Sequence, residues 1–263
     1  MPAFGLGVFR AGSGAATENA VTWALEAGYR HVDTARIYGN ERDVGRAVRR
    51  WCERSGVERG EIFVTTKLWN DDHGFDRARE AFEASLRALD IGYVDLYLVH
   101  WPVPGRRRES WRALESLVDE RRCRAVGVSN FTVAHLDELL QNARVLPAVN
   151  QIELHPFLQQ RELVRYCAER GIVVEAYSPL TKGRRLGDPR LVAIARELGR
   201  APAQVLIRWS LEKGFVVIPK SADRERIVAN ADVFDFELGE RATARLDALE
   251  ESLRTAWDPS GVA

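Results

Sequence analysis

Three features of the sequence predict an α/β fold, a (β/α)8 TIM barrel. Eight short runs rich in Val, Ile and aromatic residues alternate with longer amphipathic stretches, as buried parallel strands alternate with covering helices. The runs begin every ~25–40 residues, which is the size of one βα unit. No Pro- or Ser-rich linker and no change of composition divides the chain, so we expect residues 1–263 to form a single domain.

The predicted strands are brief, as strands buried on both faces should be. Each is bounded by polar or turn-forming residues, and none is long enough to be confused with a helix. In chain order they are FGLGVF (4–9), YRHVD (29–33), IFVTTK (62–67), VDLYLVH (94–100), RAVGVS (124–129), AVNQIE (148–153), IVVEAYS (172–178) and FVVIPK (215–220).

The predicted helices lie between these strands. The first, TENAVTWALEAG (17–28), opens on a Thr that can cap it and stops at a Gly. The next two, residues 40–56 and 75–89, repeat apolar residues at helical spacing, so each has one apolar face. Further amphipathic stretches follow at 109–120, 132–142, 160–170, 189–198, 202–213, 223–231 and 239–253.

The composition excludes several classes of protein. Of the 263 residues, 46% are hydrophobic, which is enough for one large core. Lys plus Arg and Asp plus Glu number 38 each, and a chain without net charge lacks the basic surface expected of a nucleic-acid binder. The cysteines, Cys52, Cys123 and Cys167, are odd in number and form no CxxC motif, so we expect a reducing compartment and no disulfides.

The N-terminal stretch MPAFGLGVFRAGSG shows no targeting signal. It has no basic region followed by a long apolar one, and no apolar run in the chain approaches ~18 residues. The sequence therefore predicts a cytoplasmic protein with no membrane partner.

Polar residues end nearly every predicted strand. In a (β/α)8 barrel the carboxyl ends of the strands meet at one face, where active sites lie. Polar groups are costly inside an apolar barrel unless they are paired. Such a ring indicates a shared site, with a purely structural ring as the alternative. Its members are Asp33, Lys67, His100, Ser129, Asn130, Asn150, Gln151, Glu153, Tyr177, Ser178, Lys220 and Ser221.

The segment HVDTARIYGNE (31–41) places a carboxylate and a phenol around the mouth of one strand. A tyrosine has a reference pKa of about 10, which an adjacent ammonium group lowers. Lys67 can supply that charge, Asp33 can hold the lysine in place, and His100 can orient and polarise a carbonyl group. With Tyr38 as the acid, the four residues form a proton-donating device that needs no metal. None is a natural nucleophile here, so a cofactor is implied.

The sequence resembles the aldo-keto reductases over about residues 3–250. The nearest group is that of bacterial 2,5-diketo-gluconate reductases, prostaglandin F synthase-like enzymes and methylglyoxal-type reductases. Seven motifs carry the resemblance, in order and at compatible spacing. They are HVDTARIYGNE, the lysine of TTKLWN (65–70), LYLVHWP (96–102), VGVSNF (126–131), NQIELHP (150–156), AYSPL (176–180) and VIPKS (217–221).

The resemblance implies an oxidoreductase that reduces aldehydes and ketones with NADPH. Hydride passes from C4 of the nicotinamide to the carbonyl carbon, and Tyr38 donates the proton. Small dicarbonyls, keto sugars and aromatic aldehydes are the expected substrates, and a monomer is the family default. The alternative is a non-catalytic NADPH-binding or sensing subunit, since barrels of this family also serve as channel-associated subunits and lens proteins. The intact set of four favours an enzyme.

Carried over by position, the resemblance also implies a cofactor site and a substrate pocket. Ser129, Asn130 and Gln151 would bond the nicotinamide carboxamide, Tyr177 would stack under the ring, and Ser178 and Leu180 would lie along the pyrophosphate. The adenosine end of the cofactor would be held by Lys220, Ser221, Arg226 and Asn230. Of these, the cations Lys220 and Arg226 could bind the 2′-phosphate and so favour NADPH over NADH. The substrate pocket would be lined by the aromatic residues Phe9, Trp69 and Trp101.

Three departures from the family pattern stand out. The chain starts at MPAF, almost directly on the first strand, where relatives usually begin with a hairpin that plugs the barrel floor. Ala229 stands where many relatives carry an acidic residue that helps to grip the adenine. The loop after the fourth strand and the C-terminal tail are short, which predicts an open pocket.

Several motifs have competing interpretations. GSGAAT (12–17) imitates a dinucleotide-binding fingerprint but lacks its third glycine. NDDHGFD (70–76) could be a metal loop or a solvated turn, and we expect no metal. GRRRES (105–110) is a solvated loop or a site for acidic substrates. Trp257 packs over the pocket mouth or anchors the tail to the surface.

Overall fold

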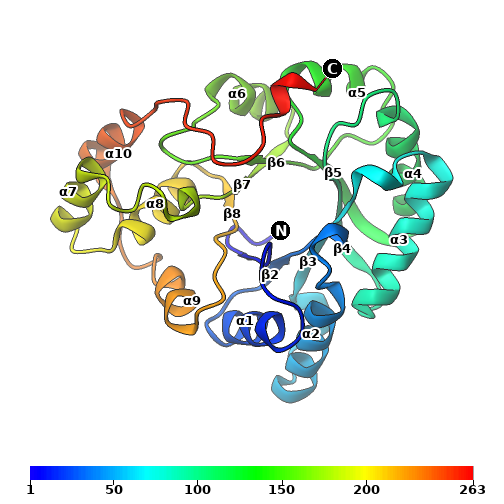
Figure 1. The fold of residues 1–263 in the computed structure, drawn as a ribbon, viewed down its shortest axis with the longest axis horizontal. Coiled ribbons are helices and arrows are strands. Elements are labelled where there is room, and N and C mark those ends of the chain that lie inside the picture. The colour runs from blue at the N-terminus through cyan, green and yellow to red at the C-terminus, as the bar shows by residue number, and fades with distance from the viewer. Residues whose placement is uncertain (263) are drawn as a thin grey trace.

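The computed structural model describes residues 1–262 and places eight parallel strands side by side in chain order. Helices lie around the outside of the sheet, as Figure 1 shows. The strands are β1 (Leu6–Gly7), β2 (His31–Asp33), β3 (Phe63–Leu68), β4 (Val94–Val99), β5 (Cys123–Ser129), β6 (Val149–Glu153), β7 (Val173–Tyr177) and β8 (Val216–Val217).

The helices follow the strands in the order that the hydrophobic pattern predicts. In residues 1–262 none of them is long and apolar enough to cross a membrane. The α-helices are α1 (Ala15–Glu26), α2 (Glu41–Ser55), α3 (Phe75–Leu89), α4 (Arg107–Asp119), α5 (Val133–Leu140), α6 (Arg161–Glu169), α7 (Pro189–Glu197), α8 (Pro202–Glu212), α9 (Arg224–Ala231) and α10 (Gly239–Asp247). The 3-10 helices are η1 (Arg36–Tyr38), η2 (Arg59–Glu61), η3 (Asn70–Asp72), η4 (Thr181–Gly183) and η5 (Pro259–Gly261).

The first and last strands are much shorter than the sequence predicts. The expected strands 4–9 and 215–220 are reduced to two residues each. Isolated parallel bridges nevertheless join Phe4 to Val217 and Gly7 to Lys220. The arrangement is consistent with a (β/α)8 fold, and the apolar runs at the two ends of the sheet pair through single bridges instead of a long ladder.

Side-chain alternation along the strands explains where the polar residues go. Successive side chains of a strand point to opposite faces, so every second residue faces the interior. Leu96, Leu98 and Val149 form a small buried apolar cluster of their own, separate from the large core between the sheet and the helices. The same alternation on β2 and β3 buries Asp33 and Lys67.

Close helix packing depends on a glycine in α2. A Cβ atom at Gly45 would collide with the backbone of Leu89 at the end of α3. Only a residue without a side chain lets the two helices approach this closely. The position therefore explains why a helix-weakening residue lies inside an amphipathic helix.

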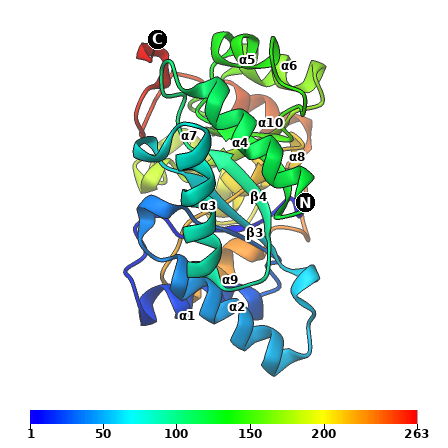
Figure 2. The same cartoon turned by 90° about the vertical axis from the view of Figure 1, so that its right-hand side faces the viewer.

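The C-terminal tail departs from the helix that the sequence predicts. The expected helix 239–253 ends at Asp247, and the following residues run across the molecule from α10 toward α5 (Figure 1). Tertiary hydrogen bonds hold the tail in this course, because the Leu253 amide donates to the Phe157 carbonyl at 2.9 Å. Figure 2 shows the tail and the N-terminus on opposite sides of the molecule.

Candidate active site

Lys67 on β3 is the centre of the candidate site. Its fully buried ammonium group donates to Asp33 Oδ1 on β2 at 2.6 Å and to the Thr34 carbonyl at 2.8 Å. A third, longer bond of 3.3 Å reaches the hydroxyl of Tyr38. All three N–H groups are therefore used, and the Tyr38 oxygen receives one of them. The phenolic hydrogen is left free to be donated to another acceptor.

The loop that carries Tyr38 is fixed on both sides. Tyr38 ends the 3-10 helix η1, and Gly39 follows with φ 69°, a left-handed conformation that favours glycine. Next, the buried side chain of Asn40 donates to the Val8 carbonyl at 3.1 Å and accepts from Thr34 Oγ1 at 2.8 Å. The turn pair in the sequence thus serves to aim the phenol at the lysine.

The ionisation of Lys67 and Tyr38 follows from burial and from their neighbours. Burial would lower the pKa of Lys67, but Asp33 and Tyr38 hold it above its ordinary value. Burial raises the pKa of Tyr38 to about 12, although Lys67 acts in the opposite direction. The expectation that the lysine brings this phenol below its reference pKa is therefore wrong for the net effect. Tyr38 stays protonated through neutral and moderately alkaline pH.

His100 follows β4 and lies beside Tyr38, with ring centroids 5.8 Å apart. Burial and the charge of Lys67 hold the pKa of His100 well below its ordinary value, so the imidazole is neutral at neutral pH. A neutral imidazole donates from one nitrogen only, and the buried Nδ1 has no hydrogen-bond partner within the described part of the chain. His100 can therefore orient a carbonyl oxygen by donating a hydrogen bond, but it brings no positive charge to that oxygen.

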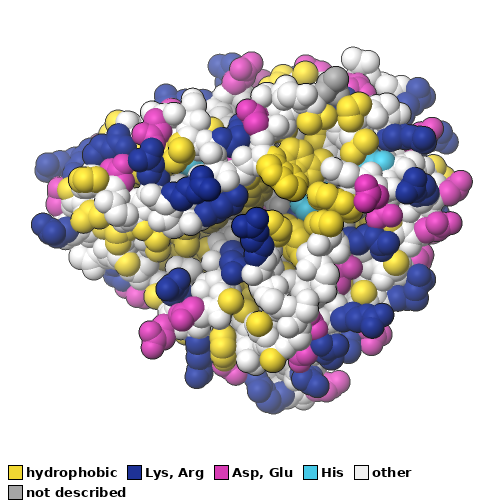
Figure 3. Space-filling model, viewed as in Figure 1, with side chains coloured by type: hydrophobic (Ala, Val, Ile, Leu, Met, Phe, Trp, Pro, Cys, Tyr) yellow, Lys and Arg dark blue, Asp and Glu magenta, His cyan; other side chains and the backbone are white. Residues whose placement is uncertain are grey.

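Aromatic side chains surround this polar group. Phe9 lies 4.9 Å from the Tyr38 ring, and Trp69 lies 5.3 Å from the His100 ring, centroid to centroid. Trp101 contacts Trp257 of the tail at 5.8 Å. Figure 3 shows a hollow lined by hydrophobic side chains near the centre of this face, with a His side chain in it and Lys and Arg side chains beside it.

The residues expected at the nicotinamide form one hydrogen-bonded group. Asn130 donates to the His100 carbonyl and to Ser129 Oγ, both at 3.0 Å, and accepts from the Tyr177 hydroxyl at 2.8 Å. Ser129 Oγ in turn donates to the Gln151 carbonyl at 2.9 Å. The half-buried Tyr177 ring is thereby tied to the end of β5. The carboxamide nitrogen of Gln151, however, already donates to Asp33 Oδ2 and Glu175 Oε2, both at 2.8 Å, so of the two carboxamide atoms the oxygen is the one left for a ligand.

The residues expected along the rest of a dinucleotide lie in two further segments, after β7 and around β8 and α9. Ser178 and Leu180 are half-buried, and Ser178 has φ 51°. Lys220 and Arg226 are exposed, and neither side chain forms an ion pair within residues 1–262. Ser221 and Asn230 are buried. No hydrogen bond between described residues links these segments to Lys67 or Tyr38.

Two acidic residues at this face were not assigned a role by sequence reasoning. Glu153 at the end of β6 accepts from the amides of Thr255 and Ala256 at 2.8 and 2.9 Å and from the Thr255 hydroxyl. Burial would raise the pKa of Glu153, but hydrogen bonds from His155 and Thr255 lower it to about 2. Glu153 therefore fastens the tail, and His155 Nε2 lies 3.4 Å from Glu153 Oε1.

The second, Glu175, lies on β7 and is fully buried. The signal for it is visible in the sequence, because IVVEAYS carries one acidic residue in an otherwise apolar strand. Its position two residues before Tyr177 gives both side chains the same face of the sheet.

The competing motifs have structural roles. Gly14 of the glycine-rich stretch precedes α1, and its amide donates to Asp43 Oδ2 at 2.7 Å. His73 is buried and contacts Ser110 Oγ at 3.1 Å, which joins the loop before α3 to α4. Within residues 1–262 no group of three or more His, Cys, Asp or Glu residues is placed to hold a metal ion. In GRRRES, Arg107 is buried and pairs with Glu138, whereas Arg106 and Arg108 are exposed.

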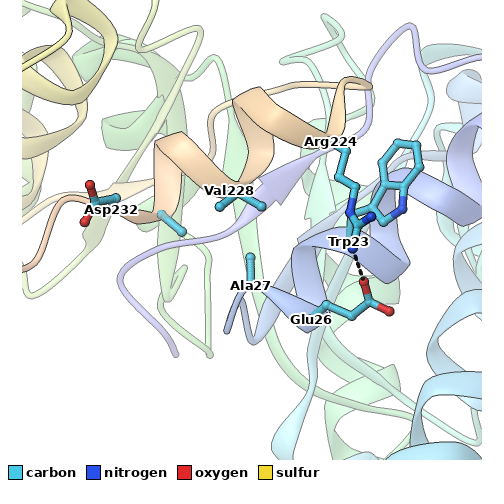
Figure 4. A pocket seen from close by; sticks show the side chains of 7 residues that line it. Trp23, Glu26, Ala27, Arg224, Val228 and Asp232 are labelled. Carbon is cyan, nitrogen blue, oxygen red and sulfur yellow. Dashed lines mark ion pairs between the residues drawn. The ribbon is translucent and has the colours of Figure 1, made fainter.

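A separate hollow lies on the helical side of the sheet, between α1 and α9 (Figure 4). An ion pair of 3.6 Å between Arg224 and Glu26 crosses it. None of the residues that line this hollow belongs to the predicted site. Its lining has no arrangement like that of Lys67 with Asp33 and Tyr38. Its lining consists of Trp23, Glu26, Ala27, Arg224, Val228, Ala231 and Asp232.

Comparison with known proteins gives consistent matches along nearly the whole chain. A model of the aldo/keto reductase family matches residues 4–251. Glyoxal reductase of Bacillus subtilis (strain 168) is 47% identical over 259 residues, covering 98% of this chain and 92% of that protein. The 9,11-endoperoxide prostaglandin H2 reductase of Trypanosoma cruzi is 48% identical over 262 residues, covering 98% and 91%. The structure of a Bombyx mori aldo-keto reductase in complex with NADP matches with a TM-score of 0.90 at 36% identity, covering 97% and 91% of the two chains.

Proposed function

The chain belongs to the aldo/keto reductase family of oxidoreductases, and on this basis we propose that it reduces aldehydes and ketones to alcohols with NADPH, with Tyr38 as the general acid. The observation that carries the proposal is the contact of Lys67 with both Asp33 and Tyr38 beneath the aromatic hollow. The expected substrates are small dicarbonyls, keto sugars and aromatic aldehydes. The similarity to glyoxal reductase and to the prostaglandin H2 reductase supports a placement near the 2,5-diketo-gluconate reductase group.

The proton transfer follows from the hydrogen-bond directions. The Tyr38 hydroxyl accepts from Lys67 at 3.3 Å, so its own hydrogen points to the carbonyl oxygen of the substrate. His100 donates a second hydrogen bond to that oxygen as a neutral imidazole. When Tyr38 gives up its proton, the phenolate is formed next to a buried ammonium group that is already in place. Because Lys67 is buried away from water, the carboxylate of Asp33 is needed to keep it protonated.

The residues present fit a dinucleotide. The exposed cations Lys220 and Arg226, which have no acidic partner in residues 1–262, suit the 2′-phosphate of NADPH. The fixed ring of Tyr177 suits stacking under the nicotinamide, and Ser129, Asn130 and the free oxygen of Gln151 suit its carboxamide. Ser178 and Leu180 suit the pyrophosphate, while Ser221 and Asn230 suit the adenosine. When bound, NADPH supplies the hydride from C4 of its nicotinamide.

The first test is a spectroscopic assay of the purified chain with NADPH. Absorbance of the reduced nicotinamide is followed with methylglyoxal, phenylglyoxal, a nitrobenzaldehyde and 2,5-diketo-gluconate. We expect oxidation that requires the carbonyl compound. Binding of NADPH without oxidation by any member of the panel would contradict the assignment as a reductase of these substrate classes.

Arg226→Ala is expected to weaken NADPH far more than NADH. A lost charge-assisted hydrogen bond costs about 1.5–3 kcal/mol, so the Kd for NADPH should rise about 10–100-fold. Arg224→Ala is the matched control, because Arg224 lies on the same helix but pairs with Glu26 at 3.6 Å. The dissociation constants are measured by titration of protein fluorescence. Equal weakening of both cofactors by Arg226→Ala would contradict the 2′-phosphate assignment.

Glu153→Gln is expected to release the tail and open the aromatic wall. The amide group cannot accept all three hydrogen bonds from Thr255 and Ala256, so Trp257 loses its fixed place against Trp101. The KM for nitrobenzaldehyde should rise severalfold, while the KM for methylglyoxal and the Kd for NADPH stay unchanged. Trp257→Ala should reproduce the effect without altering the tail anchor. A uniform change for both substrates would indicate a general loss of structure instead.

The sheet is also proposed to close as a single barrel domain. The Gly5 amide donates to the Val217 carbonyl at 3.0 Å, and the Val217 amide donates to the Ala3 carbonyl at 2.9 Å. These bonds between the two ends of the sheet support closure, and closure brings the ends of β1 and β8 to the same mouth as β2 and β3.

A further inference from the structure

We propose that Glu175 is a positioning residue for the proposed reaction, acting in its neutral form through Gln151 to fix Asp33 and hence the Lys67–Tyr38 pair. The inference rests on the proposed function for its catalytic consequence. Its structural part, a neutral carboxyl group bridged to an ionised one, is independent of that function. Glu175 is a buried acid that takes no direct part in the proposed proton transfer.

The geometry is a shared amide between two carboxyl groups. Gln151 Nε2 donates to Asp33 Oδ2 at 2.8 Å and to Glu175 Oε2 at 2.8 Å. The other oxygen of Asp33 accepts from Lys67 at 2.6 Å. Glu175 thus completes a chain that orients the Gln151 amide, and the amide in turn holds Asp33 with its second oxygen turned to the lysine.

No cation forms a hydrogen bond with Glu175 within residues 1–262. Lys67 on β3 acts on it through its charge, but the three donors of Lys67 are taken by other acceptors. From β2 come Asp33, which is acidic, and His31, whose Nε2 lies 3.6 Å from Glu175 Oε1. Burial and the charge of Lys67 lower the pKa of His31 to about 3, so this histidine is neutral. The paired strands contribute only the neutral Gln151 from β6 and Val216 from β8.

A second ionised carboxylate here would face Asp33, and the nearby ammonium group of Lys67 is hydrogen-bonded to Asp33 instead of Glu175. Glu175 Oε1 is buried and has no hydrogen-bond partner among the described residues, which is a poor environment for a carboxylate. In agreement, burial and the charge of Asp33 raise the pKa of Glu175 to about 8. Its ionisation also raises the pKa of Tyr38 further, which makes the phenol a weaker acid. We therefore expect carbonyl reduction to decline above about pH 8 as Glu175 ionises, because burial raises the pKa of Tyr38 to about 12.

The test compares Glu175→Gln and Glu175→Leu with the unaltered protein. Gln is neutral and keeps an oxygen for the Gln151 amide, whereas Leu removes the acceptor. We expect Glu175→Gln to keep its kcat within roughly twofold at pH 7 and to lose the decline near pH 8, whereas Glu175→Leu loses roughly tenfold in kcat. NADPH affinity should hold in both variants. Glu41→Gln is the matched control, since Glu41 is another buried acid, bonded to Thr66 at 2.6 Å, and should leave the pH profile unchanged.

Infrared difference spectroscopy gives a readout that needs no activity. Between pH 6 and pH 9 the carbonyl band of a protonated carboxyl group should disappear in the unaltered protein, and that change should be absent in Glu175→Gln but present in Glu41→Gln. An unchanged infrared difference in Glu175→Gln would show that the carboxyl group that titrates between pH 6 and pH 9 is not Glu175 and would overturn the proposal. Equal kcat for Glu175→Gln and Glu175→Leu at pH 7 would overturn the positioning role. A chain that reduces no carbonyl but shows the infrared result would refute the proposed function alone.

Discussion

Tyr38→Phe is expected to lower kcat for carbonyl reduction by about 10²–10⁴-fold, the contribution of general acid catalysis. The substitution removes only the hydroxyl that accepts from Lys67 at 3.3 Å and keeps the ring that packs against Phe9 and His100. The Kd for NADPH should therefore be nearly unchanged. Initial rates with methylglyoxal and a fluorescence titration with NADPH measure the two quantities on the same preparation.

The control for this substitution is Tyr29→Phe. The Tyr29 hydroxyl is also buried and donates to the Ile227 carbonyl at 3.0 Å, far along the chain from Lys67. That variant should lose some stability but little turnover. If Tyr38→Phe weakened NADPH binding and turnover in the same proportion, the hydroxyl would be structural and the general acid would have to be another group.

The four proposed catalytic residues could be grouped from the sequence because strand ends converge in parallel α/β folds. Asp33, Lys67 and His100 each follow an apolar run, and a sheet with strands in chain order brings such residues to one face. Tyr38 could be added because the turn pair Gly39 and Asn40 limits how far the chain runs before α2 begins. These inferences use only local patterns and one topological rule.

The net ionisation of Tyr38 could not be predicted in the same way. The sequence shows that a lysine is near, and Lys67 does act to lower the phenol's pKa. It does not show how completely the surrounding side chains exclude water, and burial outweighs the lysine. The sign of a pKa shift depends on the competition between these two effects, which requires the packed structure.

The course of the C-terminal tail could not be predicted from the sequence for a related reason. Residues 239–253 have a helical pattern, but the contacts of Leu253 and Thr255 with Phe157 and Glu153 are formed by segments about a hundred positions apart. Such tertiary bonds override local helix preference and leave no periodic signal. The proposed role of Glu175 could be predicted only in part from the sequence. An acidic residue in an apolar strand is easily noticed, but the residues to which it bonds cannot be identified without the structure.

Lys67→Met is expected to damage both turnover and stability. Turnover falls by about 10²-fold or more, because the Tyr38 phenolate loses the ammonium group that stabilises it. Removing one partner of a buried ion pair costs about 3–5 kcal/mol, which for a chain of this size lowers Tm on the order of 10 °C. Asp33 is then left buried with Gln151 as its remaining donor and takes up a proton to avoid an unpaired charge.

The pH dependence of that loss follows from the sign of the Asp33 shift. Burial raises the pKa of Asp33 in the folded state, and Lys67 no longer opposes it in the variant. A raised folded pKa means that stability is fully present below the unfolded pKa of about 3.9 and is lost as the pH rises through the folded value. The Tm deficit of Lys67→Met should therefore be larger at pH 7 than at pH 5, as measured by thermal unfolding at the two pH values.

The double variant Asp33→Asn with Lys67→Met separates the two effects. Replacing a buried ion pair by neutral groups of similar size is often neutral or stabilising, so the Tm should recover and lose its pH dependence. Turnover should not recover, because Tyr38 still lacks its cation. A double variant that regained activity would show that Lys67 serves only to neutralise Asp33, whereas one that regained neither would show that the lysine positions the barrel interior by its shape and hydrogen bonds more than by its charge.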